Sequence, residues 1–198
     1  MSPRPRSRSD REIFAATHRV ISEVGPGGLT LARVADEVGL SPAALLQRFG
    51  SKRQLLVAFV EHGVDATARQ LRERDREGAS ALESLLTLLS ETEGFADTPE
   101  QLGNHAAFLH MDLTDPDFHR PTLRHFRLLL DETRSLLERA SSAGEISPGG
   151  DLEALARTLL AIRNGGLLNW AIERRGSAAD YVRTRLRHLL ECHASQPG

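Results

Sequence analysis

Small and hydrogen-bonding side chains that could read a nucleic acid gather at the start of a short helix predicted after Ser41. Ser41, Pro42, Ala43, Ala44 and Gln47 are the residues expected to face outward there. The small side chains let the backbone approach a base edge closely, and the Gln47 amide can make a bidentate contact to adenine. Such a helix presents its N-terminal residues to a major groove about 12 Å wide. The pattern therefore predicts DNA recognition at this helix.

Residues 30–49 have the spacing that two short crossed helices require. Ala35 is small where the helices approach, and Gly39, four residues later, provides the positive φ of the turn. Apolar residues fix the crossing angle, namely Val34, Val38, Leu40 and Leu45. A tight helical corner without any DNA contact is the alternative interpretation. The capping residues Thr30 and Ser41, and the basic residues that flank the motif, favour a helix-turn-helix.

The rest of the chain predicts further helices and no strand, which gives an all-α fold of nine helices, three in a head and six in a body. Alternation of apolar and polar residues never persists long enough for a strand. Residues that cap helices recur along the chain: Ser9, Thr30, Ser41, Ser51, Thr98, Asp151 and Ser177. Long helices are expected from Ser51 to about Arg76 and from Pro121 to just before Gly144, and a single helix is expected over residues 99–113.

The charge is divided unevenly along the chain. Residues 1–55 contain nine Lys and Arg side chains against five Asp and Glu, for a net charge of +4, and the remainder carries −6. One of the nine, Arg33, is a candidate for DNA contact. A basic N-terminal part suits a protein whose N-terminal part alone meets phosphate. Residues 1–8 are predicted to form a disordered basic arm, which either lies in a minor groove or only keeps the chain in solution.

The order of these features resembles the TetR family of transcriptional regulators. The resemblance covers residues 10–62 and rests on three consecutive segments after an N-terminal helix: the run T-L-x-x-V-A-x-x-V-G-L-S, a recognition helix that ends in Phe, and the run S-K-x-x-L. It implies phosphate contacts at Thr30, Ser41 and Lys52.

The resemblance also implies a domain organisation. Residues 9–55 would form the helix-turn-helix DNA-binding domain, and residues 56–198 would form a helical domain that binds an effector and dimerises through its last two helices. Outside residues 10–62 the resemblance rests only on the number and length of the helices and on the total size.

One position departs from the pattern of this family. The recognition helix of the family usually contains an aromatic residue, typically Tyr, followed two residues later by His, whereas this chain has Leu46 and Arg48. No phosphate contact is therefore expected at Leu46. The charge of Arg48 can replace that contact, which would make DNA binding steeply dependent on salt.

The helix predicted over residues 152–174 is apolar on nearly all sides, so it must be buried on more than one. Gly165 and Gly166 each cost about 1 kcal/mol relative to Ala inside a helix. Close approach of a second subunit would offset this cost, and a space left for a ligand is the second interpretation. The final helix has a narrower apolar stripe that suits a four-helix seam. A homodimer is predicted, with an ordinary monomer core as the alternative.

Aromatic and polar side chains of the predicted body could line a small-molecule cavity, which is usually apolar with a few polar groups. The ligand-binding candidates are Phe59, Phe95, His105, Phe108, Met111, Phe126, Asn164 and Trp170. Most of them are expected to belong to the hydrophobic core instead.

The sequence lacks the patterns of common enzyme and metal sites. It has no G-x-S-x-G, P-loop, dinucleotide-binding glycine or H-E-x-x-H pattern, so neither enzymatic activity nor a cofactor is expected. Potential metal ligands between residues 105 and 119 do not have the spacing of a structural zinc site, and no metal is expected. No apolar run is long enough to cross a bilayer, and a single cysteine, Cys192, fits a reducing cytoplasmic setting.

Together these patterns predict a cytoplasmic homodimer, and the resemblance implies that it represses transcription from a palindromic operator and is released by a small lipophilic effector. The two copies of the helix-turn-helix would enter successive major grooves, about one helical turn apart. The alternative is a helical small-molecule-binding or protein-interaction module that has lost sequence-specific DNA binding. The leucine at position 46 motivates that alternative.

Overall fold

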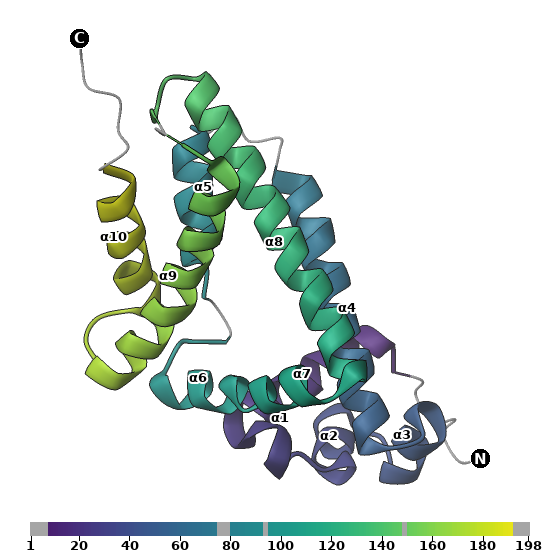
Figure 1. The fold of residues 1–198 in the computed structure, drawn as a ribbon. Helices are drawn as coiled ribbons and strands as arrows, with labels where there is room; N and C mark the ends of the chain where they lie inside the picture. Colours follow the sequence, from purple (N-terminus) through teal and green to yellow (C-terminus); the bar gives the residue numbers. More distant parts are fainter. Residues whose placement is uncertain (1–7, 75–79, 93–94, 148–149, 192–198) are drawn as a thin grey trace. The chain divides into compact units, whose positions relative to one another are not determined.

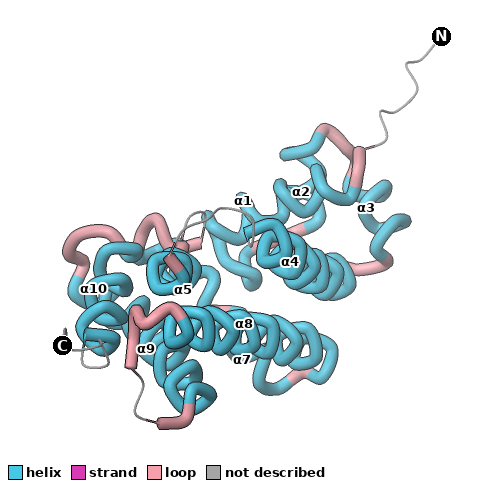
Figure 2. Tube along the Cα trace, turned by 90° about the horizontal axis from the view of Figure 1, so that it is seen from above, coloured by secondary structure: helices cyan, strands magenta, loops and turns pink. Residues whose placement is uncertain are grey.

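The computed structural model describes residues 8–74, 80–92, 95–147 and 150–191. Within these ranges the chain forms helices joined by short loops and no strand, as Figure 2 shows. This confirms the all-α prediction. The chain divides into two compact units. Unit 1 comprises the described residues up to Ala66 together with Gly103–Leu123, and unit 2 comprises Thr67–Leu102 and the described residues from Arg124.

Unit 1 contains the predicted three-helix head together with residues 103–123, which come later in the chain. Its helices are α1 (Asp10–Gly28), α2 (Leu31–Val38), α3 (Pro42–Phe49), the first part of α4 (Lys52–Arg74), the end of α6 (Pro99–Ala106), α7 (Phe108–Thr114) and the start of α8 (Pro116–Ser142). Its core joins α1 to the helix-turn-helix and α4, and the most buried side chains include Ile13, Ile21, Leu45, Leu55 and Phe118. Unit 1 therefore extends beyond the predicted residues 9–55.

Unit 2 is built around three mutually packed helices, α5 (Ala81–Ser90), α9 (Leu152–Glu173) and α10 (Ala178–Glu191). Figure 1 shows α9 and α10 side by side. The second half of α4 and most of α8 complete the unit, whose core includes Leu85, Leu89, Leu137, Leu159 and Leu186. The helices α4 and α8 each contain residues of both units.

The predicted helix starts are confirmed by their caps. Each predicted capping side chain accepts a hydrogen bond from a backbone N–H two or three residues later: Ser9, Thr30, Ser41, Ser51, Thr98, Asp151 and Ser177. The Ser9 backbone N–H in turn donates to the Glu12 carboxylate (2.9 Å), which completes a capping box. Regular helix in α1 is interrupted at Gly25, which has a φ of +67°.

Two predicted boundaries are wrong. The single helix expected over residues 99–113 is broken at Ala107, between Leu102, which belongs to the core of unit 2, and Phe108, which belongs to that of unit 1. The next helix begins at Pro116 rather than at Pro121, because the Asp115 carboxylate accepts a hydrogen bond from the Asp117 N–H (3.0 Å) and caps it.

The prediction of a disordered arm over residues 1–8 is wrong at Arg8, and residues 1–7 lie outside the described residues. The Arg8 Nε donates to the Val38 carbonyl (2.8 Å), and its Nη1 donates to the Glu12 carboxylate (2.8 Å). The chain entering the fold is therefore attached to the end of α2. No helix in the described ranges is both long enough and apolar enough to cross a membrane.

Candidate functional site

The crossing of α2 and α3 is built as the sequence predicts. Val34, Ala35 and Leu45 are fully buried at it. Gly39 adopts the left-handed conformation (φ +67°, ψ +38°) that ends α2, and the Leu40 N–H bonds to the Ala35 carbonyl (2.9 Å). A residue with a Cβ would be strained there. The helix-turn-helix is thus fixed by packing and by one tight turn.

The recognition helix α3 presents the predicted side chains to solvent. Pro42, Ala43 and Gln47 are exposed, and Ala44 is half-buried. The Ser41 hydroxyl accepts from the Ala44 N–H (3.2 Å), so the helix start is rigid and keeps a hydroxyl hydrogen free for an acceptor. This exposed N-terminal half is the geometry that base-edge contacts in a major groove require.

The basic side chains predicted to meet phosphate have partners within unit 1. The Arg48 guanidinium contacts the Asp10 carboxylate (2.8 Å) and the Arg8 carbonyl (2.6 Å), and the Lys52 ammonium donates to the Gly27 carbonyl (2.9 Å). Arg33 is exposed and forms no ion pair within the described part of the chain. A phosphate contact by Arg48 would therefore compete with its ion pair to Asp10.

Sequence reasoning missed one contact at this surface. Arg53, next to Lys52, donates to the carboxylates of Asp115 (2.7 Å) and Asp117 (2.9 Å), which keeps its pKa above the ordinary value and ties α4 to the start of α8. Leu46 is 51% exposed on α3, where it can offer only apolar contacts. The Asp115-Pro116 pair is typical of a capped helix start, but it gives no sign of the contact with Arg53.

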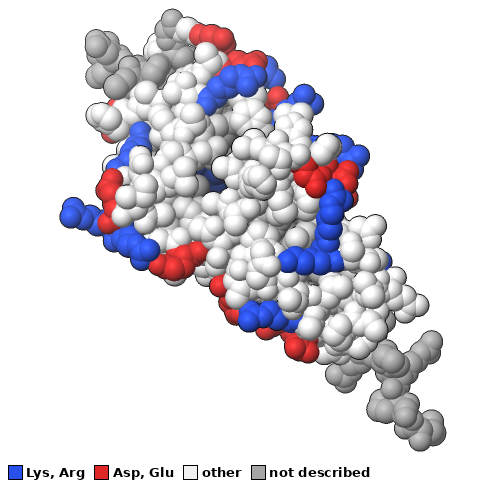
Figure 3. All heavy atoms as spheres, turned by 60° about the horizontal axis from the view of Figure 1, so that its bottom comes forward, with Lys and Arg blue, Asp and Glu red and all other residues white. Residues whose placement is uncertain are grey.

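Acidic side chains lie beside many of the basic ones. Figure 3 shows this at several places on one face, and the contacts within unit 1 include Arg19 with Glu37 (3.0 Å) and Arg120 with Glu61 (3.1 Å). The residue ranges of unit 1 hold ten basic and ten acidic residues. The net positive charge of residues 1–55 is therefore cancelled by acidic residues elsewhere in unit 1. Attraction to phosphate must come from where individual basic side chains lie on the surface.

The eight predicted ligand-binding residues are divided between the two units. Phe59, His105, Phe108 and Met111 belong to unit 1, where Phe108 is buried and its ring lies near those of Phe59 and Phe118; Phe95, Phe126, Asn164 and Trp170 belong to unit 2. Trp170 is a core residue whose indole N–H donates to the Gly176 carbonyl (3.0 Å). Phe95 alone among the eight lines one of the cavities found within the described parts of the units.

Two cavities of unit 2 differ in their charge. The first, called here the arginine cavity, has a volume of about 390 Å³. Its apolar lining residues are Leu71, Leu88, Phe95 and Leu129, and its polar lining residues are Thr67, Gln70, Glu91, His125 and Arg163. None of its polar residues was among the candidates. An arginine within the apolar sequence of α9 was the signal that could have revealed it.

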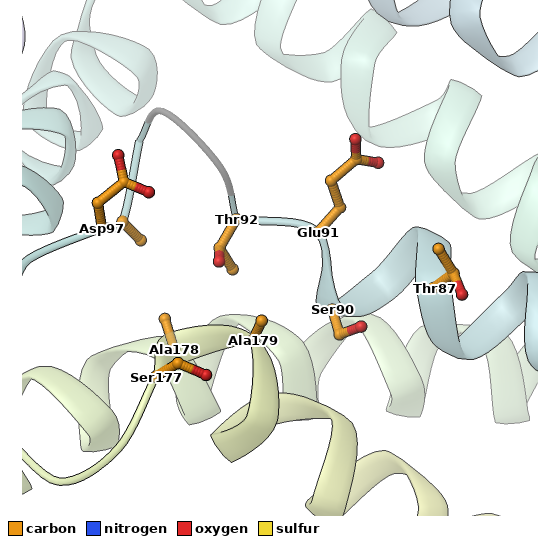
Figure 4. Close-up of a pocket in the computed structure, with 9 residues that line it drawn as sticks. Thr87, Ser90, Glu91, Thr92, Asp97, Ser177, Ala178 and Ala179 are labelled. Atoms are coloured by element: carbon orange, nitrogen blue, oxygen red, sulfur yellow. The ribbon is translucent and has the colours of Figure 1, made fainter.

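The second, called here the hydroxyl cavity, has a volume of about 530 Å³ and lies between the end of α5, the loop after it and the start of α10 (Figure 4). Small residues and hydroxyls line it, together with the carboxylates of Glu91 and Asp97. Figure 4 shows that the Glu91 side chain points away from Ala178 and Ala179. None of the described residues that line the hydroxyl cavity carries a basic side chain.

His105 lies against α1 rather than in a described cavity. Its Nε2 is 3.2 Å from the Ser22 hydroxyl, and its ring centroid is 5.2 Å from that of His18. Burial, and then the charge of His18, lower the pKa of His105 to about 4. The imidazole is therefore neutral in the folded protein at neutral pH.

The depressed pKa of His105 predicts a loss of stability in acid. The unfolded chain, in which the pKa is near 6.5, takes up the proton first, so the free energy of unfolding falls as the pH drops from about 6.5 towards 4. Because the side chain is partly solvated, the expected loss is about 1–2 kcal/mol. Urea unfolding at pH 7.5 and pH 5 measures this loss.

The variant His105→Gln should reduce the loss, whereas His110→Gln, at an exposed position, should not. Equal pH dependence in all three proteins would contradict the assignment of the loss to His105.

Residues 13–59 match the sequence profile of the family described as bacterial regulatory proteins, tetR family. The chain is 31% identical over 91 residues to the nucleoid occlusion factor SlmA of Aliivibrio fischeri, which covers 44% of this chain and 46% of that protein. It is 23% identical over 155 residues to the HTH-type transcriptional repressor AcnR of Corynebacterium diphtheriae, which covers 78% of this chain and 77% of that protein. The chain thus spans about half the length of SlmA in that match.

Solved structures share the fold over nearly the whole chain. A TetR transcription regulator from Haloarcula marismortui has a TM-score of 0.78 at 20% identity, covering 93% of this chain and 97% of that one. A protein from Saccharomonospora viridis, solved in complex with choline, has a TM-score of 0.79 at 19% identity, covering 95% and 98%. Residues 13–59 are thus a helix-turn-helix of the TetR family, and the chain shares the fold of these solved structures along nearly all of its length.

Proposed function

We propose that this protein is a ligand-responsive transcriptional repressor that binds a palindromic operator as a homodimer. The observation that carries the proposal is the recognition helix α3, whose Ala43 and Gln47 are exposed while Leu45 anchors the helix in the core. Such a helix can present its N-terminal half to base edges without unfolding. AcnR, which is similar over most of both chains, is named as a repressor.

Effector binding would act through α4. This helix supplies Leu55 and Leu56 to the core that holds the helix-turn-helix, and Leu71 to the wall of the arginine cavity. A ligand that prefers one position of α4 would change the spacing of the two recognition helices and so weaken operator binding. The choline held by the similar structure from Saccharomonospora viridis supports a small molecule as effector.

Binding of the full chain to DNA upstream of its own gene tests the proposal. Fluorescence anisotropy at several salt concentrations should show an affinity at least about 1,000-fold above that for unrelated DNA, with a linear fall of log affinity against log salt. Equal affinity for both DNAs at every salt concentration would instead favour a helical module that has lost specific DNA binding.

The dimer is proposed to form through α9 and α10. Ala161, Gly165, Leu168 and Ile172 share one face of α9, and Leu168 and Ile172 are 54% and 79% exposed. A Cβ built on Gly165 meets nothing within 4 Å, whereas one on Gly166 lies 3.4 Å from Val182 of α10. Gly166 thus serves packing within the chain, and Gly165 leaves an open face for a partner subunit.

Leu168→Glu is expected to convert the dimer to a monomer, because it places a charge in an apolar interface where it has no partner. Size-exclusion chromatography with light scattering at micromolar concentration measures the change. Leu113→Glu, at a leucine of α7 that is 70% exposed, is the matched control and should remain dimeric. A monomeric wild-type protein, or a dimeric Leu168→Glu variant, would contradict this interface.

A further inference from the structure

The arginine cavity holds a basic group whose charge is poorly matched by its surroundings. The Arg163 guanidinium lies 5.6 Å from the centre of the Phe95 ring and donates to the Asn164 side-chain oxygen (3.2 Å). Within the described part of the chain no carboxylate forms an ion pair with it. Burial lowers the pKa of Arg163, and Glu91 acts in the opposite direction, yet a guanidinium stays protonated at neutral pH. A cation in such a place gains strongly from an added anion.

A second group in the cavity favours the same kind of ligand. His125 of α8 lines it, and burial, followed by the charge of Arg163, lowers the pKa of His125. A neutral imidazole can donate one hydrogen bond to an anion. The acidic residue of the lining, Glu91, is exposed, and an ion pair with an exposed carboxylate contributes little, so a cationic ligand would gain little there.

The remaining walls suit an apolar group. Leu71, Leu88 and Leu129 come from three different helices, and the cavity volume of about 390 Å³ lies within the range of small-molecule sites. The cavity therefore has one charged end and apolar sides, all contributed by unit 2.

We propose that the arginine cavity binds an organic anion, with a carboxylate or phosphate against Arg163 and an apolar chain or ring among the leucines. The proposal rests on the proposed function in one respect, namely that this anion is the effector that weakens operator binding. The binding itself requires no DNA.

Calorimetric titration of the full chain with four ligands of one chain length tests the charge preference. The probes are octanoate, octyl phosphate, octanol and octylammonium. At least one anion should bind 10-fold or more tightly than octanol, and octylammonium should bind most weakly. The proposal is overturned if neither anion binds more tightly than octanol.

Arg163→Met locates the site. It should weaken binding of the anions at least 10-fold and leave octanol binding within 3-fold, because Met keeps much of the side-chain volume without the charge. Arg157→Met, at an exposed arginine on the same helix, is the matched control and should bind as the wild type does. Thermal unfolding verifies that both variants are folded.

Anion binding that survives Arg163→Met would place the ligand elsewhere and overturn the assignment. Because no DNA is present in the calorimeter, a negative result leaves operator binding untouched. Conversely, a failure to bind operator DNA would not contradict anion binding in the arginine cavity. It would contradict only the proposal that the bound anion is the effector.

Discussion

Leu45→Ala is expected to lower the free energy of unfolding by about 2–5 kcal/mol, because it leaves a cavity at the crossing of α2 and α3. Leu45 is fully buried there. The loss is a large part of the roughly 5–15 kcal/mol that holds a folded domain together. Urea unfolding monitored by circular dichroism measures it.

The neighbouring leucine is the control for this prediction. Leu46 is 51% exposed, so Leu46→Ala should change the free energy of unfolding by no more than about 0.5 kcal/mol. Similar losses in the two variants would mean that Leu45 does not anchor the recognition helix.

Ala43→Glu is expected to weaken operator binding by at least about 100-fold without destabilising the fold. Ala43 is exposed near the start of α3, where a longer side chain keeps the backbone from the base edges and a carboxylate is repelled by phosphates. Since acidic residues are tolerated at helix starts, the free energy of unfolding should stay within about 0.5 kcal/mol of the wild-type value. Fluorescence anisotropy with operator DNA measures the loss of affinity.

Ala15→Glu provides a matched change away from the recognition helix. Ala15 is exposed on α1 and outside the predicted contacts, so this variant should keep operator affinity within about 3-fold, as one remote charge alters only long-range attraction. Equal losses in both variants would show that added negative charge, rather than position 43, weakens binding.

Local sequence signals were sufficient where a residue acts on its immediate neighbours. The caps at Ser9, Thr30 and Ser41 depend on a hydroxyl three residues before a backbone N–H, and the left-handed turn depends on Gly39. The buried positions of the crossing follow from helical periodicity. For these reasons the helix-turn-helix could be predicted almost residue by residue.

Sequence reasoning failed where distant segments meet. The contact of Arg53 with Asp115 and Asp117 joins positions about sixty residues apart, and it was not predicted. The same holds for the charge balance, because residues 103–123 add acidic groups to the compact unit of the helix-turn-helix. The net positive charge of residues 1–55 is therefore a property of that segment and not of the compact unit to which it belongs.

The ligand-binding candidates show the same limit. The chemistry of aromatic side chains suggests a ligand site, yet Phe108 and Trp170 are buried in two separate cores. A cavity forms instead where leucines, His125 and Arg163 converge. Which helices enclose a cavity depends on packing between elements that no local pattern encodes.

Selection of binding sites from a random pool of duplex DNA tests the central claim most directly. With the wild-type protein, the enriched sequences should contain two half-sites related by two-fold symmetry and spaced by about one helical turn, since a symmetric dimer places two recognition helices in successive major grooves. The Ala43→Glu variant should enrich no such sequence. Failure of the wild-type protein to enrich any common sequence beyond that variant would contradict sequence-specific DNA binding by α3.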